Sequence, residues 1–309
     1  MLQQTQVATV LPYYARFLAR FPTLEDLAAA PVGEVMALWS GLGYYARARN
    51  LHACARTVMS EYGGRFPAEA QQLRELPGIG RSTANSIATF CFGARQPILD
   101  GNVKRVLTRC FAIEGFPGNS AVEQQLWDLA EHLMPRTQAD TYNQAQMDLG
   151  ATLCTRSKPR CTDCPLAEIC LAHATQREAE LPHRKARREI PQRQVTLLIL
   201  RNGNHVLLER RPPAGIWGGL WSLPELPEDA RAENFAKQSL ACQINGVSPA
   251  PTVVHTFTHF RLHISPLICR VVKQTAAMES GFEWHDLRDI ANVALPAPIK
   301  KLLSALDTN

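Results

Sequence analysis

The sequence predicts two domains of different fold class, a mainly helical first part and a mixed α/β second part. Through residue 172, apolar residues recur at helical spacing between proline and glycine breakers. After about residue 193 the pattern changes to short apolar runs of the kind that form strands. A chain of 309 residues is long enough for two domains of ordinary size, each with its own core.

The helical part contains five segments in which apolar residues repeat every three to four positions. These segments cover residues 10–21, 35–39, 51–59, 82–92 and 122–134. Breakers such as Gly63-Gly64 and Pro117-Gly118 fall between them. We therefore expect helices joined by short turns and no sheet in this part.

Residues 173–192 predict a linker, because four basic residues crowd between two prolines. They are Arg184, Lys185, Arg187 and Arg188. A short run of this kind is more often a solvated linker than a DNA contact. Beyond it, the apolar runs 195–200 and 206–208 flank Asn202-Gly203-Asn204, which is a strong hairpin signal. A further strand over 260–268 and a closing helix over 296–306 complete an α/β domain.

Charge and composition restrict the partners and the location of the chain. The net charge is +5, and the segment ending at Arg193 has 22 basic and 18 acidic residues, which leaves 11 and 10 after it. This excess permits a polyanionic partner without requiring one. No run of about 18 apolar residues predicts a membrane span, and the first residues lack the features of a signal peptide. We expect a cytoplasmic protein with no membrane partner.

A glycine turn over residues 76–84 offers a candidate grip for nucleic acid. Gly78 and Gly80 bracket Ile79 after a proline and precede a predicted helix. Glycine permits a tight turn, and it lets a phosphate approach the N–H groups of the helix that follows. An ordinary helix–helix connection is the alternative interpretation. Further along, Asp100 is the carboxylate that we expect beside bound DNA.

Four of the nine cysteines form one compact run with the spacing C-x6-C-x2-C-x5-C. They are Cys154, Cys161, Cys164 and Cys170. Four-cysteine zinc sites usually show two separated C-x2-C pairs, so this spacing favours an iron–sulfur cluster over zinc. Disulfides are not expected without an export signal. Arg156, Lys158 and Arg160 lie between the first two cysteines, where they either contact phosphates or are simply solvated.

These features together resemble the helix-hairpin-helix DNA glycosylases of the endonuclease III-like superfamily, and within it the MutY-type adenine DNA glycosylases. Segments 1–7, 41–50 and 143–150 support the resemblance, as do 211–220 and 257–260 in the second part. The implied fold is a mainly α helix-hairpin-helix glycosylase domain over 1–172. Its iron–sulfur loop, 154–170, would carry a [4Fe-4S] cluster. A basic linker over 173–192 and a Nudix-like, 8-oxoguanine-recognition α/β domain over 193–309 follow.

The resemblance implies a monofunctional DNA N-glycosylase of base excision repair. Its substrate would be double-stranded DNA with A·8-oxoguanine or A·G mispairs, from which adenine is flipped out and released by N-glycosidic bond hydrolysis. Asp100 would stabilise the positive charge that develops on the sugar, with Asn102 orienting it. Ser82 would be one of the DNA-binding residues; bifunctional relatives carry at this position a lysine that forms a Schiff base, so serine implies a glycosylase without lyase activity. A bifunctional glycosylase-lyase and a non-catalytic lesion-DNA-binding protein remain the alternatives.

The resemblance also assigns residues to the recognition of the mispair. Gln4 and Tyr44 would belong to elements that wedge into the duplex, although core packing beside a neighbouring tyrosine is the alternative for Tyr44. Phe257, Thr258 and His259 match the segment that reads 8-oxoguanine, with threonine in place of the expected serine. The second domain lacks the carboxylate pattern of Nudix hydrolases, so recognition and not pyrophosphate hydrolysis is expected of it.

One departure from the family concerns the start of the chain. In the family, a glutamate that protonates adenine lies two residues before the methionine that matches Met1, and nothing here corresponds to it. A misassigned start or a truncated form would explain this. We expect the chain as written to bind lesion DNA poorly to moderately and to excise adenine very slowly. The family also implies a monomer in the bacterial cytosol or nucleoid, with mismatch-repair or replication-clamp proteins as candidate partners.

Overall fold

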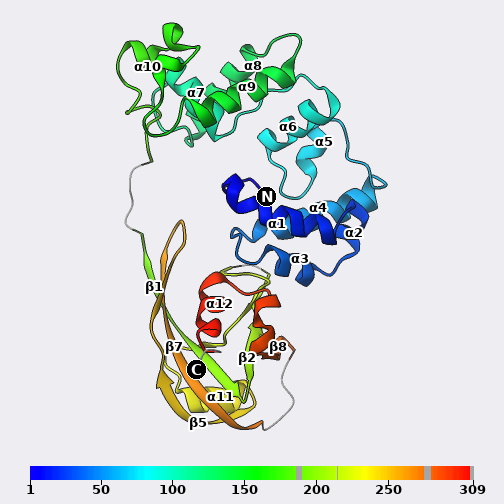
Figure 1. Ribbon diagram of the computed structural model, residues 1–309, viewed down its shortest axis with the longest axis vertical. Helices are drawn as coiled ribbons and strands as arrows, with labels where there is room; N and C mark the ends of the chain where they lie inside the picture. Colours follow the sequence, from blue (N-terminus) through cyan, green and yellow to red (C-terminus); the bar gives the residue numbers. More distant parts are fainter. Residues whose placement is uncertain (186–189, 214, 275–279, 307–309) are drawn as a thin grey trace. The chain divides into compact units, whose positions relative to one another are not determined.

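The structure is a computed structural model that describes residues 1–185, 190–213, 215–274 and 280–306 (Figure 1). Its contacts divide the chain into two compact units, one made of Met1–Arg56 with Glu189–Asn309 and the other of Thr57–Arg188. Arg187 and Arg188 of the predicted basic linker lie outside the described residues. Among the residues described, no helix is long and apolar enough to cross a membrane.

The first unit begins with helices α1 (Val7–Arg20), α2 (Leu24–Ala29), α3 (Val32–Trp39) and the start of α4 (Ala46–Glu61), which continues into the second unit. Phe17 and Trp39 meet edge to face at 6.1 Å between ring centroids, and both are buried. Thr23 begins α2 with a capping box, in which its side chain and that of Asp26 each accept the other's backbone N–H. These helices are therefore fixed both by a shared apolar core and by local caps.

The rest of the first unit is built on one eight-stranded sheet in which β1 pairs in parallel with β7 and the other pairings are antiparallel. Its strands are β1 (Gln192–Asn202), β2 (His205–Arg210), β3 (Trp221–Ser222), β4 (Glu225–Leu226), β5 (Cys242–Pro249), β6 (Val253–Thr256), β7 (Arg261–Gln274) and β8 (Phe282–Asp286). The central order is β3-β2-β1-β7-β5. The predicted hairpin is confirmed, since Asn202 of β1 pairs with His205 of β2.

Successive side chains of β1 point to opposite faces of the sheet, and each face has its own core. Leu197 and Ile199 pack with α12 (Ala297–Ser304), the short helix η3 (Leu287–Asn292) and apolar residues of α1–α3. Leu198 and Leu200 pack with α11 (Ala232–Ser239) on the other face. Helices thus cover both faces of the sheet (Figure 1).

The second unit is helical in the residues described. After the end of α4 it contains α5 (Ala70–Glu75), α6 (Arg81–Phe92), α7 (Gly101–Cys110), α8 (Ser120–His132), α9 (Ala139–Thr152), η1 (Cys161–Asp163), η2 (Ala167–Ile169) and α10 (Leu171–Ala174). Val103 and Leu107 of α7 pack on Leu126 and Trp127 of α8 to form its core. The predicted order, a helical part followed by an α/β part, is confirmed.

Candidate nucleic-acid interface and metal centre

The glycine turn joins α5 to α6 as a helix–hairpin–helix. The N–H of Ile79 donates to the carbonyl of Leu76 at 3.1 Å. Gly78 has a φ of 79°, a backbone conformation that residues with a Cβ rarely adopt. Gly80 is the N-cap of α6, and a Cβ placed on it would have nothing within 4 Å. The backbone at the start of α6 is therefore open to close approach by an anion.

Asp100 is the N-cap of α7, which fixes the direction of its carboxylate. Its Oδ1 accepts from the N–H groups of Asn102 at 2.9 Å and Val103 at 2.8 Å, while the Asn102 side chain lies 3.4 Å from Oδ2. The Ser82 hydroxyl accepts from the N–H of Leu99 at 3.2 Å. Since Leu99 immediately precedes Asp100, this bond couples the hairpin helix to the carboxylate.

Arg105, which the sequence analysis did not single out, connects the Asp100 region to the cysteine loop. Its guanidinium donates to Asn102 Oδ1 at 2.8 Å, to the Gly150 carbonyl at 2.6 Å and to the Cys154 carbonyl at 2.7 Å. Burial lowers the pKa of Arg105 from its ordinary value. One side chain thus joins α7, α9 and the first cysteine.

All four predicted cysteines line one small cavity together with Arg109 and other residues. Arg109 is only 3% exposed, and its guanidinium donates to the Cys154 sulfur at 3.3 Å and to the carbonyls of Leu181 at 2.9 Å and Thr155 at 2.8 Å. The guanidinium of Arg109 therefore places a positive charge beside one of the four sulfurs. Four cysteine sulfurs around one cavity are a donor set that suits an iron–sulfur cluster or a soft metal ion.

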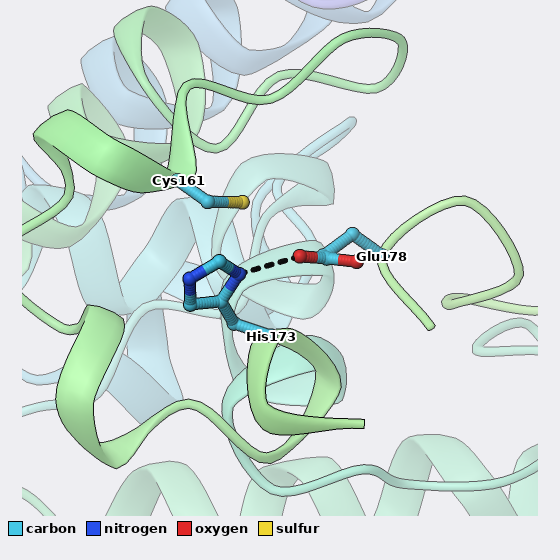
Figure 2. A group of neighbouring side chains, drawn as sticks. All are labelled: Cys161, His173 and Glu178. Atoms are coloured by element: carbon cyan, nitrogen blue, oxygen red, sulfur yellow. Dashed lines mark hydrogen bonds and ion pairs between the residues drawn. The ribbon is translucent and has the colours of Figure 1, made fainter. Parts of the chain in front are cut away.

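Two further side chains reach Cys161, and neither was predicted from the sequence (Figure 2). One donor atom each of Cys161, His173 and Glu178 lie within 4.8 Å of one another, and His173 Nδ1 is 2.7 Å from a Glu178 carboxylate oxygen. Burial, and after it the Glu178 carboxylate, raise the pKa of the Cys161 thiol to about 11. A bound cation would be needed to hold this sulfur as a thiolate at neutral pH.

The three predicted cations of the cysteine loop line one open groove of about 820 Å³. Arg156, Lys158 and Arg160 are exposed there, and Arg184 joins them. Arg160 also lies 3.7 Å from the carboxylate of Asp163, so part of its charge is balanced within the loop. Asp163 and Glu178 also line the groove, and it adjoins the cysteines because Cys161 lines it as well.

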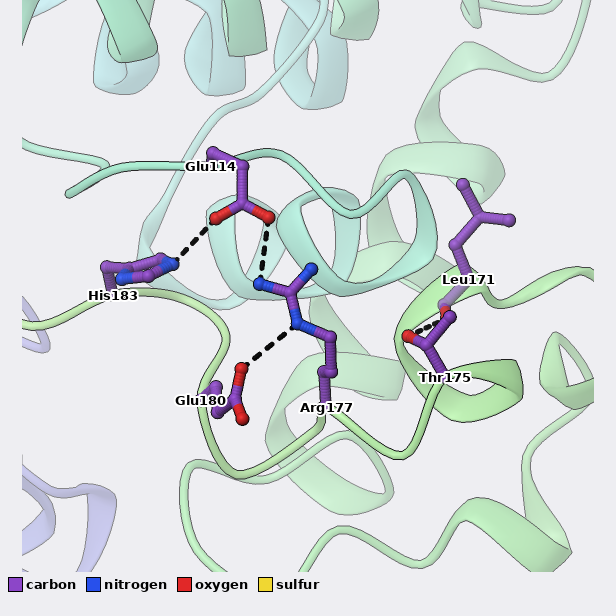
Figure 3. A network of polar contacts seen from close by, with 6 residues as sticks. All are labelled: Glu114, Leu171, Thr175, Arg177, Glu180 and His183. Atoms are coloured by element: carbon purple, nitrogen blue, oxygen red, sulfur yellow. Dashed lines mark hydrogen bonds and ion pairs between the residues drawn. The ribbon is translucent and has the colours of Figure 1, made fainter.

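An ion-pair network fastens the segment after α10 to the loop after α7 (Figure 3). The guanidinium of Arg177 donates to Glu114 at 2.8 Å and to Glu180 at 3.0 Å, and His183 lies 2.8 Å from the other oxygen of Glu114. Hydrogen bonds from Arg177 and His183 lower the pKa of Glu114. Isolated surface ion pairs contribute little, but a connected network holds a segment in one position more effectively.

In the first unit, Gln4 and Tyr44 both adopt left-handed backbone conformations, with φ of 58° and 49°. Such strain persists only where neighbouring contacts impose it, and it concentrates at functional sites. Arg47 supplies the contacts here. Its guanidinium donates to the carbonyls of Met1 at 2.6 Å, of Gly43 at 3.2 Å and of Gln3, and to the Thr5 hydroxyl at 2.9 Å.

Residues from both ends of the first unit line one cavity of about 860 Å³. The N-terminal segment of the unit contributes Gln4 and Tyr44 to the lining. The β6–β7 turn contributes Phe257, Thr258 and His259. The turn is closed by a hydrogen bond of 2.9 Å from the Phe257 N–H to the Phe260 carbonyl. Within it the Phe257 ring stacks on that of Phe260, and Thr258 and His259 are exposed.

The predicted residues therefore gather into two groups. The hairpin, Asp100 and the cysteine loop belong to the second unit, while Gln4, Tyr44 and the β6–β7 turn belong to the first. Arg47, Arg109 and Glu178 escaped sequence reasoning, since their partners become neighbours only on folding.

Two family models match the chain, in the order of its two folds. One, described as "HhH-GPD superfamily base excision DNA repair protein", matches residues 1–132, and the other, described as "NUDIX domain", matches residues 195–305. Among solved structures, a thermostable thymine-DNA glycosylase is similar with a TM-score of 0.50 and 29% identity, over 56% of this chain and 80% of that one. The fold and the site thus define a helix-hairpin-helix glycosylase of base excision repair.

Whole-chain relatives narrow this class. The adenine DNA glycosylase of Buchnera aphidicola subsp. Acyrthosiphon pisum is 33% identical over 100% of this chain and 89% of its own length. That of Rattus norvegicus is 35% identical over 98% of this chain and 69% of its own length. The chain belongs to the adenine DNA glycosylase (MutY) family, and it is accordingly a DNA N-glycosylase.

Proposed function

We propose that this chain excises adenine paired with 8-oxoguanine or guanine in double-stranded DNA, and that it does so as a monofunctional glycosylase. The observation that carries the proposal is the cavity of about 860 Å³ in the first unit. Segments expected to enter the duplex, at Gln4 and Tyr44, line the same cavity as the Phe257-Thr258-His259 turn. A base opposite the flipped adenine would meet both sets of residues at once.

The backbone of the DNA is held by residues of the second unit in this proposal. The N-terminus of α6 beyond Gly78 and Gly80 presents N–H groups to one phosphate. Arg156, Lys158 and Arg160 face other phosphates from the groove beside the cysteines. These contacts carry no base specificity, so they set the position of the duplex and leave discrimination to the cavity of the first unit.

Asp100 supplies the negative charge at the reacting sugar. As the N-glycosidic bond breaks, positive charge develops on the sugar ring, and a carboxylate already fixed in direction stabilises it without reorganising. The cap of α7 and the Asn102 amide provide that fixed direction. Ser82 accepts a backbone hydrogen bond and offers no amine, so the reaction ends with hydrolysis and without a Schiff base.

The cysteine cavity holds a [4Fe-4S] cluster through Cys154, Cys161, Cys164 and Cys170. When bound, such a cluster supplies four metal–thiolate bonds that cross-link its loop. Arg109 stabilises one of these sulfurs and the backbone around it. An absorbance band near roughly 400 nm in the purified chain, with iron and sulfide in equal amounts, would support the cluster. Stoichiometric zinc without that band would contradict it.

Adenine release from three duplexes tests the function. Excision by the chain as written is expected to be slow, but under single-turnover conditions it should still release adenine faster from A·8-oxoguanine than from A·G, and not measurably from A·T. Thr258→Val removes one hydroxyl and leaves the shape of the side chain nearly unchanged. It should reduce the ratio of the release rates on A·8-oxoguanine and A·G by roughly tenfold, as expected for loss of one specific hydrogen bond. Thr252→Val is the matched control outside the cavity. Equal rates on all three duplexes would contradict the proposal.

Borohydride distinguishes the bifunctional alternative. It reduces a Schiff base to a stable covalent link between enzyme and DNA. With abasic DNA and this chain, we expect no covalent complex above the level given by the Ser82→Ala variant. Because serine has no amine, any trapped complex should persist in Ser82→Ala; it would identify an amine elsewhere in the chain as the nucleophile and replace hydrolysis by a lyase reaction.

A further inference from the structure

The segment that leads into Asp100 is buried although it belongs to neither a helix nor a strand. Residues 93–100 follow α6 and precede α7, and Ile98 and Leu99 are only 2% and 3% exposed. Backbone N–H and C=O groups that are buried in this way need hydrogen-bond partners. Because residues 93–100 form no regular element, side chains of neighbouring helices supply these partners.

One face of α6 provides three of the side chains. They are Ser82, Asn85 and Thr89, whose spacing of i, i+3 and i+7 puts them on the same side of the helix. Their partners are, in the same order, the Leu99 N–H at 3.2 Å, the Pro97 carbonyl at 2.7 Å and the Gln96 carbonyl at 3.1 Å. The segment is therefore bonded along its length to α6, in the direction opposite to that of the helix.

Asn143 of α9 provides the fourth side chain. It is 1% exposed, its Oδ1 accepts from the Ile98 N–H at 3.2 Å, and its Nδ2 donates to the Gln96 carbonyl at 2.9 Å. One side-chain amide thus accepts from one backbone group of the segment and donates to another, as the backbone of a paired strand does. Buried hydrogen bonds of this kind hold a backbone in one position, since leaving either group unpaired is costly.

The cap of α7 fixes the Asp100 carboxylate relative to its own helix, and the four side chains of α6 and α9 fix the backbone that enters from the other direction. We propose that these four are positioning residues, with Asn143 foremost, which hold Asp100 at the place where positive charge develops on the sugar. The inference rests on the proposed function, in which Asp100 stabilises that charge. A displacement of about 1 Å is enough to reduce such stabilisation substantially.

Two duplexes report the charge of Asp100 without requiring excision. Opposite 8-oxoguanine, one carries a protonated pyrrolidine ring in place of the sugar of the adenosine, and the other carries an uncharged tetrahydrofuran ring. The ratio of their dissociation constants measures the attraction between the carboxylate and a positively charged sugar. We expect the full chain to prefer the cationic ring by about tenfold or more, and Asp100→Asn, which keeps the cap but not the charge, to lose this preference.

Asn143→Leu keeps the approximate size of the side chain and removes both of its hydrogen bonds. It should reduce the preference for the cationic ring by roughly fivefold, while affinity for the uncharged ring changes by less than about twofold. Combined with Asp100→Asn, the same substitution should have no further effect, because both residues act through one charge. A merely structural role would instead weaken binding of the two duplexes alike, with or without the Asp100 carboxylate.

Two buried threonines keep the test decisive if Asn143→Leu loses its helices in far-ultraviolet circular dichroism. Thr89 and Thr108 are 2% and 0% exposed, but within the described part of the chain only the Thr89 hydroxyl has a hydrogen-bond partner. Valine removes the hydroxyl from each and keeps the shape. Thr89→Val should reduce the preference for the cationic ring by roughly twofold to threefold, and Thr108→Val, the matched control, should leave it unchanged.

The outcomes separate this inference from the proposed function. A preference for the cationic ring that survives both Asn143→Leu and Thr89→Val would overturn the inference and leave the role of Asp100 in place. An effect of Asn143→Leu that persists beside Asp100→Asn would overturn it as well. Equal affinity of the unaltered chain for the two rings would overturn the role of Asp100 together with the inference, while adenine release from the mispaired duplexes is measured independently.

Discussion

The carboxylate of Asp100 has one oxygen committed to the cap of α7 and one turned toward the Asn102 amide. Capping by an aspartate contributes about 1 kcal/mol to a helix, so the residue has a structural role whatever its chemistry. Asparagine caps a helix about as well but has no charge. Replacement by asparagine therefore separates the two roles, which alanine would not.

We predict that Asp100→Asn lowers the single-turnover rate of adenine release by about 10²–10³-fold, the usual loss when one preorganised electrostatic group is removed. Affinity for an A·8-oxoguanine duplex should change by less than about threefold, and the thermal midpoint should stay within about 2 °C because the cap is kept. Asp128→Asn on α8 is the control for the chemical change. A loss of rate below tenfold would show that the charge of Asp100 does not stabilise the transition state.

Arg47 is the residue that holds Gln4 and Tyr44 in their strained conformations. Its planar guanidinium reaches four oxygens of two segments and lies 5.4 Å from the centre of the Tyr44 ring. A lysine ammonium is a compact donor and cannot span the same oxygens. Arg47→Lys would therefore keep the positive charge but lose the arrangement of hydrogen bonds.

We therefore predict that Arg47→Lys weakens binding to an A·8-oxoguanine duplex by roughly tenfold, the equivalent of about one lost charged hydrogen bond. Binding to an undamaged duplex should change less, because phosphate contacts lie elsewhere. Fluorescence anisotropy at one fixed salt concentration measures both affinities. Arg16→Lys on α1 is the control, and equal losses on the two duplexes would argue against a role in recognition.

At the scale of elements, amphipathic helices could be predicted from the sequence, and helices that bury small or polar residues could not. The prediction over 82–92 matches α6 to within one residue at its start, and the closing helix over 296–306 matches α12. By contrast, α9 buries Asn143 and Gly150, so it has no apolar stripe to find. The strand β1 extends to Gln192 because the backbone of Gln192 pairs with that of Arg261 in β7. The pattern of apolar and polar side chains does not indicate this contact.

The same division applies to the site. The four cysteines were identifiable because a cluster or zinc loop is local in sequence and leaves its spacing there. The side chains that hold the loop were not, because Arg109 meets Leu181 across 72 positions and Arg105 meets Cys154 across 49. Neither the residue types nor their spacing carries information about such contacts. Only the packing of α7 on α9 and α10 creates them.

The packing of α7 on α9 depends on the absence of a side chain at Gly150. A Cβ there would lie 2.6 Å from the Cβ of Asn102 and 3.0 Å from its Cα. We predict that Gly150→Ala destabilises the second unit by about 1–3 kcal/mol, the usual cost of overpacking. Because Asn102 must shift, adenine release should also slow at temperatures where the variant is fully folded.

Denaturant unfolding and single-turnover rates measure these two effects separately. Gly33→Ala in α3 is the control, since a Cβ there would meet only the end of a flexible arginine at 3.8 Å. That change should be neutral or slightly stabilising, because alanine favours helix over glycine. If Gly150→Ala were as stable as the parent and released adenine as fast, close packing of α7 on α9 would not be required for stability or activity.

At the scale of the whole molecule, the first unit joins both ends of the chain in one core. Val10, Phe17 and Trp39 belong to the same buried cluster as Leu197 and Ile199 of the sheet. Hydrogen bonds from Ser40 to the Leu295 carbonyl at 2.9 Å and from Arg49 to the Gly218 carbonyl at 2.6 Å reinforce it. The cavity proposed to read 8-oxoguanine is therefore only as stable as this joint core.

A half-buried histidine makes that stability depend on pH. Burial lowers the pKa of His255, whose ring meets Phe257 edge to face at 4.6 Å between centroids, and burial does the same to His285. With the folded pKa below the unfolded value, the unfolded chain takes up protons first as the pH falls. Stability is then fully present above about pH 6.5 and is lost as the pH falls below it.

We predict that the thermal midpoint of the first unit, followed by tryptophan fluorescence, falls between pH 7.5 and pH 5.5. The fall should be smaller in His255→Gln, which cannot take up the proton, and His285 should account for part of what remains. His259→Gln changes an exposed ring two positions past Phe257 and serves as the control. A midpoint that rises as the pH falls, or a slope that His255→Gln leaves intact, would place the pH dependence elsewhere in the molecule.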